Sequence, residues 1–217
     1  MLAGCGSKRR RTVRTPAPPP PAASPAKIVV PSNAKAIHVE TGLASWYGGP
    51  YHNRRASNGE IYDMNAPTAA HRTLPFNSIV RVTNLKTGSS TLVRITDRGP
   101  FVENRIIDLS MAAAREADVW RPGVARVKLE VLVAPKPLDH GGRWAVQFGA
   151  FKQEDAARHL QERLTSRYSS SRVQSFVSPV GDWWVRIRVP ADDRKYAYNV
   201  ASKNSPSEGN AYLVRLD

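Results

Sequence analysis

Four side chains in the first half of the sequence are of types that carry acid–base chemistry, namely Glu60, Asp63, His71 and Asp97. Breaking a glycosidic bond requires a carboxylic acid that protonates the leaving oxygen, and hydrolases add a second carboxylate as base or nucleophile. A lytic reaction can dispense with the second carboxylate, because the 6-hydroxyl of the sugar itself attacks and forms an anhydro product. One carboxyl group can then act first as acid and afterwards as base.

A strand predicted over residues 91–96 sets the direction of Asp97, the acid that we favour. Alternate residues of a strand face the same side, so Val93, Ile95 and Asp97 share a face if the strand continues. This places the Asp97 carboxyl at the mouth of an otherwise apolar barrel interior, where partial loss of hydration is expected to raise its pKa. The alternative is that Asp97 braces the following turn through its own backbone.

The other three residues have structural explanations as well. Glu60 follows the turn signal Asn58-Gly59 and, taken alone, would be a solvated residue after a hairpin. His71 could be a hydrogen-bonded structural histidine, or near a carboxylate it could orient that acid or bind a sugar hydroxyl. Asp63 could serve only to position its neighbours. No recurrent metal-ligand spacing is present, so we expect neither a metal nor another cofactor.

Composition limits the class of protein. The 217 residues include 32 Lys and Arg against 18 Asp and Glu, a net charge of +14. A hydrophobic content of 41%, with five Trp, excludes a wholly disordered chain. Apolar runs fall far short of the roughly 18 to 20 residues that span a bilayer, so no transmembrane helix is expected. Cys5 is the only cysteine, which excludes an internal disulfide and a cysteine-based zinc site.

Residues 1–41 are predicted to form a basic, proline-rich tether. The first 40 residues hold seven Lys and Arg against one Glu, and seven of the 17 prolines. Proline fixes φ and lacks a backbone donor, so such a stretch does not pair into a sheet. Leu2-Ala3-Gly4-Cys5 fits a lipobox, which precedes a cysteine that becomes lipid-modified, although no apolar segment precedes Leu2. An incidental cytosolic cysteine is the alternative.

Residues 42–134 read as a mainly β domain. Short strands separated by turns are expected at 43–47, 79–83, 91–96, 105–109 and 125–133. Their alternation of apolar residues with arginines predicts a half-buried sheet or a small barrel. Ser110 can N-cap a single helix over residues 111–117.

A proline- and glycine-rich linker at 135–141 separates a second domain, residues 142–217. Apolar residues recurring every fourth position predict a helix over 154–168. A second helix at 192–202 and four strands complete a strand, helix, strand, strand, helix, strand order; the strands are expected at 144–151, 173–178, 184–189 and 211–216. This order predicts a four-stranded antiparallel sheet with two helices on one face, the α+β layering of the ferredoxin-like class.

The middle domain also contains a series of motifs in fixed order: Gly42-Leu43-Ala44-Ser45-Trp46-Tyr47-Gly48, Asn58-Gly59-Glu60-Ile61-Tyr62-Asp63, Thr68-Ala69-Ala70-His71, Thr96-Asp97-Arg98-Gly99-Pro100 and Arg105-Ile106-Ile107-Asp108-Leu109-Ser110. Together they resemble the rare lipoprotein A (RlpA) family of septal lytic transglycosylases. The resemblance implies a six-stranded double-psi β-barrel whose groove is lined by Glu60, Asp63, His71 and Asp97. It also implies a periplasmic enzyme, anchored to the outer membrane through Cys5, that cuts peptidoglycan glycan strands.

The C-terminal domain is similar to a SPOR domain, a septal peptidoglycan-binding module. That resemblance implies binding of glycan strands stripped of their stem peptides, enrichment at the division septum, and divisome proteins as neighbours. It places Gln147, Trp184 and Arg186 at binding positions on the sheet face away from the helices. We expect this face to be exposed, although Trp184 could be ordinary core. In the barrel, Trp46 and Tyr47 could stack on sugar rings or belong to the core.

Two other classes of function compete with the enzyme. The first is a noncatalytic, expansin-like wall binder, in which Glu60 and Asp97 would only hold sugar. The second is a nucleic-acid-binding protein, suggested by the net charge and an RRM-like strand order. Nearly half of the basic excess lies in the tether, and residues 146–151 do not follow the RNP1 pattern, so no nucleic-acid partner is expected. We therefore predict a peptidoglycan lytic transglycosylase that acts on peptide-free strands and leaves 1,6-anhydro ends.

Overall fold

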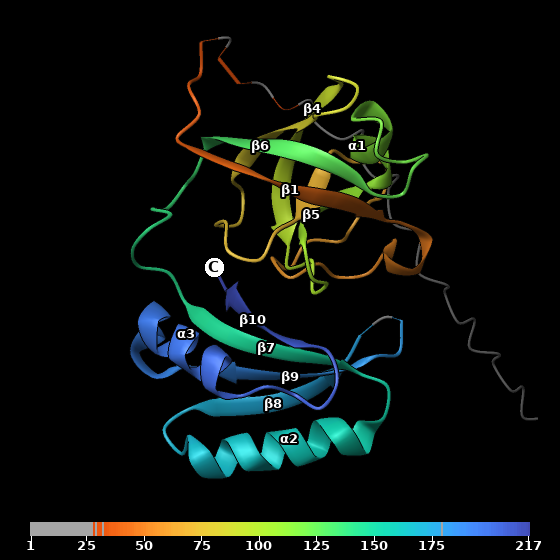
Figure 1. The fold of residues 1–217 in the computed structure, drawn as a ribbon. Coiled ribbons are helices and arrows are strands. Elements are labelled where there is room, and N and C mark those ends of the chain that lie inside the picture. The colour runs from red at the N-terminus through yellow and green to blue at the C-terminus, as the bar shows by residue number, and fades with distance from the viewer. Residues whose placement is uncertain (1–27, 29, 32, 179) are drawn as a thin grey trace, which may run out of the picture.

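The computed structural model describes residues 28, 30–31, 33–178 and 180–217. Cys5 and most of the predicted tether lie outside these residues. Figure 1 shows a β-barrel above an open sheet, with the helices α2 and α3 on the far side of that sheet. No helix in the described part of the chain is long and apolar enough to cross a membrane.

The upper unit in Figure 1 is a closed barrel with the strand order β1-β5-β2-β4-β3-β6. Its strands are β1 (His38–Tyr47), β2 (Thr68–Ala70), β3 (Ile79–Asn84), β4 (Ser90–Asp97), β5 (Arg105–Ser110) and β6 (Ala125–Val133). Alternate apolar side chains such as Val80, Val93 and Ile107 are fully buried inside it. The predicted six-stranded barrel is confirmed.

Two strands differ from the sequence-based prediction. β2 has only three residues, too few to show the alternation that identifies a strand. β1 begins at His38 rather than at residue 43, because its first half pairs antiparallel with β6. The N-cap prediction is confirmed: the Ser110 Oγ accepts a hydrogen bond from the Ala113 N–H at 3.2 Å and starts α1 (Met111–Glu116). A 3-10 turn, η1 (Gly49–Tyr51), follows β1.

The lower unit is a four-stranded antiparallel sheet in the order β10-β7-β9-β8. Its elements are β7 (Trp144–Phe151), α2 (Glu154–Arg167), β8 (Arg172–Val177), β9 (Trp183–Arg188), the 3-10 turn η2 (Pro190–Asp192), α3 (Arg194–Lys203) and β10 (Asn210–Arg215). Both helices cover one face, where Leu160 and Val200 pack with Phe148 and Ile187. The predicted α+β layering is therefore confirmed. α3 begins later than expected, because the Asp193 side chain accepts hydrogen bonds from backbone N–H groups of its first turn.

The second face of this sheet is not exposed, which corrects the expectation from the sequence. Gln147 is 2% exposed and Trp184 is 8% exposed. The Trp184 ring lies 5.1 Å from the ring of Phe101, which belongs to the loop after β4. Phe101 also lies 5.7 Å from the Tyr212 ring of β10. Alternation showed which residues share this face, but the barrel loop that covers it comes from a distant part of the sequence.

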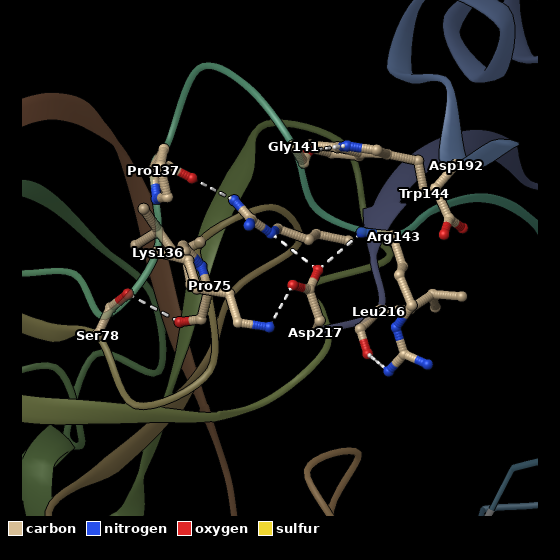
Figure 2. Close-up of polar contacts among 12 residues, drawn as sticks. Pro75, Ser78, Lys136, Pro137, Gly141, Arg143, Trp144, Asp192, Leu216 and Asp217 are labelled. Carbon is tan, nitrogen blue, oxygen red and sulfur yellow. Dashed lines mark hydrogen bonds and ion pairs between the residues drawn. The ribbon is translucent and has the colours of Figure 1, made fainter.

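Polar contacts at the C-terminus hold the linker against the sheet unit (Figure 2). The Asp217 carboxylate accepts hydrogen bonds from Lys136 Nζ at 2.7 Å, from the Arg143 N–H at 2.8 Å and from Arg215 Nε at 3.1 Å. Although burial alone would raise the pKa of Asp217, these donors hold it well below its usual range. Arg215 also donates to the Pro137 carbonyl at 2.6 Å. The linker is thus fixed to the end of β10.

Candidate active site

A cavity of about 440 Å³ lies between the barrel and the sheet. We call its two sides the barrel wall and the sheet wall. The barrel wall includes Tyr47, Ala70, Asp97, Arg98, Phe101 and Asp108, and the sheet wall includes Gln147, Phe176, Trp184 and Arg186. The volume is within the range of small-ligand sites, and polar groups converge on it from both sides.

Asp97 ends β4, just after a register shift in the pairing of β4 with β2, and lies in the barrel wall. Its Oδ1 accepts hydrogen bonds from the Ser57 N–H at 3.0 Å, from the Ser57 hydroxyl and from the Arg98 N–H at 2.8 Å. Within the described residues no hydrogen bond reaches Oδ2. The three donors therefore fix the orientation of the carboxylate and leave Oδ2 available to a ligand.

Asp108 is a second carboxyl group of the barrel wall, and the sequence analysis did not assign it a role. Its carboxylate accepts hydrogen bonds from the Ser45 hydroxyl at 2.8 Å and from Arg105 at 3.2 Å. Burial raises the pKa of Asp108 in spite of these two partners, and the charge of Asp97 acts in the same direction. Asp108 is the one acidic residue of β5, which is the local signal that could have drawn attention to it.

The register of β2 explains why the two acids share one wall. Ala70 pairs with Asp97 of β4 on one side and with Asp108 of β5 on the other. Neighbouring strands lie about 4.8 Å apart, so the two aspartates are separated by about 10 Å between their Cα atoms. The small side chain of Ala70 lies between them and also lines the cavity.

His71 is buried and lies outside the cavity lining. Its Nδ1 accepts hydrogen bonds from the backbone N–H groups of Thr73 at 3.2 Å and Leu74 at 3.0 Å. The proton of the neutral ring must then be on Nε2, which donates to Glu40 Oε2 at 3.3 Å. Burial lowers the pKa of His71, and Glu40 opposes this effect. The His71 N–H donates to the Asp97 carbonyl at 3.1 Å, so this histidine supports the backbone of the acid.

Glu60 and Asp63 also lie outside the residues that line the cavity. Glu60 accepts two hydrogen bonds from Arg94, at 2.8 Å and 2.7 Å, and this partner lowers the pKa of Glu60. The Asp63 carboxylate accepts a hydrogen bond from the Asn65 N–H at 2.9 Å, which closes a local turn. The four predicted acid–base residues are therefore not gathered around one cavity, and a catalytic role for Glu60 and Asp63 stays a prediction.

Of the two aromatic residues that were predicted to stack on sugar rings, Tyr47 lines the cavity and Trp46 does not. The Tyr47 ring stacks on Tyr62 at 4.4 Å. Burial raises the pKa of Tyr47, so its hydroxyl stays protonated at neutral pH. Trp46 points away from the cavity and packs against the barrel core, with its ring 6.5 Å from Trp120.

The sheet wall presents one cationic group to the cavity. Arg186 of β9 is paired in register with Gln147 of β7, and its Nη2 and Nε donate to the Gln147 Oε1 at 2.6 Å and 3.1 Å. The guanidinium carbon lies 4.9 Å from the ring centroid of Phe176. All three residues predicted to bind glycan, Gln147, Trp184 and Arg186, thus line the same cavity as Asp97. Among the described residues, no cluster of three or more His, Cys, Asp or Glu could hold a metal ion.

Comparisons with known proteins agree with both units. Residues 39–129 match the lytic transglycolase family, and residues 140–215 match the SPOR domain family. The chain belongs to the RlpA family. "Endolytic peptidoglycan transglycosylase RlpA" of Neisseria meningitidis serogroup A is 56% identical over 147 residues, which cover 67% of this chain and 62% of that protein. The RlpA protein of Helicobacter pylori strain J99, which has the same description, is 42% identical over 161 residues, covering 61% and 51%.

The chain thus spans about half to three-fifths of the length of these RlpA relatives. Among solved structures, an expansin of Clavibacter michiganensis covers 82% of this chain and 90% of its own, with 12% identity and a TM-score of 0.36. A score this low supports no conclusion about function.

Proposed function

We propose that this RlpA-family protein is an endolytic peptidoglycan transglycosylase that cuts peptide-free glycan strands and leaves 1,6-anhydro-N-acetylmuramic acid ends. The observation that carries the proposal is the pair of carboxyl groups, Asp97 and Asp108, on either side of Ala70 in one cavity. The two RlpA relatives are described as endolytic peptidoglycan transglycosylases, which supports the same activity.

The two carboxyl groups divide the acid–base chemistry between them. Asp108, whose pKa is raised by burial, is assigned as the group that donates a proton to the glycosidic oxygen as the bond breaks. The 6-hydroxyl of the same sugar then attacks C1, and its proton passes to Asp108, which restores the starting state. The Asp97 carboxylate, held by Ser57, stabilises the positive charge that develops at C1. In the sequence-based prediction Asp97 was the principal acid.

Product analysis on purified strands tests the proposed reaction. The full-length protein should convert strands freed of their stem peptides to fragments that carry anhydro ends, detected by mass spectrometry. Binding without any cleavage would overturn the proposal and favour the noncatalytic, expansin-like alternative.

We also propose that lipid-modified Cys5 anchors the protein to the outer membrane and that the SPOR domain concentrates it at the septum, near divisome proteins. The lipobox motif and the SPOR match support these two proposals. Cys5→Ser should release the protein from the membrane fraction into the soluble periplasm. Equal membrane recovery of the variant and the wild type would contradict the anchor.

A further inference from the structure

A second cavity, of about 920 Å³, lies in the barrel, and within the described residues it shares no lining residue with the first cavity. We call it the basic groove. Its charged and aromatic lining residues are Lys86, Arg115, Asp118, Trp120, Arg121 and Arg126. The groove includes the turn that leads into β4 at Ser90, whereas Asp97 ends that strand, so roughly 24 Å of strand separate the two sites. In Figure 1 the α1 helix and this turn lie at the end of the barrel away from the sheet.

The four cationic side chains of the basic groove differ from the rest of the barrel in their contacts. In the described structure Lys86, Arg115, Arg121 and Arg126 contact neither a carboxylate nor a backbone carbonyl through their side chains, although all four are exposed. Each of the other eight Lys and Arg of residues 42–134 has such a partner. The acid of the groove, Asp118, accepts a hydrogen bond from the Ser89 hydroxyl. A hollow surface lined by charges of one sign attracts an anionic ligand.

The floor of the basic groove is held together by a buried amide. Asn84 is 2% exposed, and its Nδ2 donates to the Ala117 carbonyl at 3.0 Å and to the Asp118 carbonyl at 3.3 Å. Its Oδ1 accepts hydrogen bonds from the backbone N–H groups of Lys86 at 2.9 Å and Thr87 at 3.4 Å. The turn after β3 and the loop after α1 are therefore joined before any ligand arrives.

Trp120 provides an apolar surface beside the cations. Its side chain belongs to a residue that is 39% exposed, and the Arg115 guanidinium carbon lies 5.0 Å from its ring centroid. A guanidinium can bind a carboxylate through two parallel hydrogen bonds, and an indole face packs against aliphatic groups. A concave site of this volume fits a short peptide with free carboxylates. A flat bilayer surface and a nucleic acid, which needs cations along a row of phosphates, fit it less well.

We propose that the basic groove binds the carboxylates of the stem peptides on uncut peptidoglycan. This inference rests on the proposed function, which places the protein among strands that still carry these peptides. The barrel then has two ligand sites at opposite ends, one for the strand that is cut and one for a neighbouring, peptide-bearing strand. Binding at the groove raises the effective concentration of the catalytic cavity beside the wall.

The test compares two soluble ligands that differ only in charge. One is a muropeptide, a disaccharide that carries a tetrapeptide with free carboxylates, and the other is the same muropeptide with its carboxylates converted to N-methylamides. Dissociation constants are measured by calorimetry on the full-length protein at low ionic strength. We expect the free acid to bind about 10-fold more tightly, as two or three exposed charge pairs allow.

Arg121→Gln combined with Arg126→Gln should reduce this preference to about twofold or less. Both side chains are exposed, so the variant should fold normally. The matched control is Arg158→Gln combined with Arg163→Gln, which removes the same charge from exposed positions of α2 and should keep the full preference. Cleavage of peptide-free strands by the groove variant should stay within about twofold of the wild type, because the two sites are far apart.

Equal binding of the two muropeptides by the wild type, or an unchanged preference in the groove variant, would overturn the inference. So would vesicles of phosphatidylglycerol that bind the wild type but not the groove variant while muropeptides do not bind, since the groove would then take a lipid phosphate. Anhydro products without a muropeptide preference reject the role of the groove alone. A preference without anhydro products rejects the proposed transglycosylase and leaves the groove standing.

Discussion

On the barrel wall of the cavity two carboxyl groups, Asp97 and Asp108, flank Ala70, whereas the sheet wall opposite carries the Arg186 guanidinium supported by Gln147. The acids can transfer protons but offer little that would select one glycan from another. The cation can recognise an anionic group but cannot break a glycosidic bond. In the proposed reaction, the acids of the barrel wall carry the chemistry, and the sheet wall supplies groups from a second domain to the same cavity.

The largest expected effect comes from removing an acid of the barrel wall. Asp108→Asn and Asp97→Asn keep the shape of the site but remove proton transfer or charge stabilisation, so turnover should fall by roughly 10²- to 10⁴-fold. Strand binding should survive in both variants, because the sheet wall is unchanged. Release of anhydro fragments from labelled strands measures the turnover.

Asp63→Asn is the matched control for these two variants, because Asp63 lies outside the cavity lining. It should keep most of the wild-type turnover. A loss as large as that of Asp108→Asn would place Asp63 in the catalytic site and would contradict the assignment of chemistry to the cavity acids.

The sequence predicted the barrel wall better than the sheet wall. Asp97 does line the cavity, but the cavity lies between the barrel and the sheet, whereas Val93 and Ile95, which were expected to share its face, are buried in the barrel core. Asp108 received no role because nothing in its own strand shows that Ala70 aligns it with Asp97; that alignment depends on the three-residue strand β2. The cover over Trp184 could not be predicted either, since Phe101 reaches it across more than 80 positions of the sequence.

The contact between the two walls should depend on Arg98. Its guanidinium donates to the Asp217 carbonyl at 2.9 Å and lies 3.6 Å from the Phe76 ring centroid, and burial lowers its pKa to about 9. Arg98→Met keeps the packing but leaves several buried carbonyl groups without a donor, so the free energy of unfolding should fall by about 2 to 4 kcal/mol. Scanning calorimetry should also show the barrel and the sheet melting separately.

Arg94→Met provides the comparison for this measurement. Arg94 pairs with the exposed Glu60, and such surface pairs contribute about 0 to 1 kcal/mol. If the two methionine variants lose the same stability, the carbonyl contacts of Arg98 do not hold the domains together.

A smaller effect should appear in the pH dependence of stability. The pKa of His71 is lowered by burial from its ordinary value of 6.5, so the unfolded chain takes up a proton that the folded chain resists. The free energy of unfolding should therefore fall as the pH drops below about 6.5. The full loss is roughly 1.4 kcal/mol for each pH unit by which the fold lowers the pKa of His71. The hydrogen bond from His71 lowers the pKa of Glu40. The stability that Glu40 contributes is therefore also lost as the pH falls, below about 4.5.

Melting temperatures between pH 7.5 and pH 5 measure this effect. His71→Asn, which keeps an acceptor for the Thr73 and Leu74 N–H groups but does not titrate, should flatten the curve. A wild-type melting temperature that stays constant over this range would show that His71 is not held neutral by the fold.

The smallest effect is expected for Glu60→Gln. Glu60 is exposed and its main partner is Arg94, so loss of the ion pair should change stability by less than about 1 kcal/mol. Turnover should fall by less than about fivefold, because the change reaches Asp97 only indirectly, through the loop that carries Ser57. A loss of 10²-fold or more, measured in the same anhydro-product assay, would show that Glu60 is a catalytic carboxylate.

Cleavage in ¹⁸O-labelled water tests the central claim most directly. If the 6-hydroxyl of the sugar is the nucleophile and Asp108 only transfers its proton, no oxygen from water enters the new ends. Mass spectrometry of peptide-free strands cut by the full-length protein should then find unlabelled anhydro ends, and Asp108→Asn should abolish them. Reducing ends that carry ¹⁸O would contradict the account, because they require water as the nucleophile and make the protein a hydrolase.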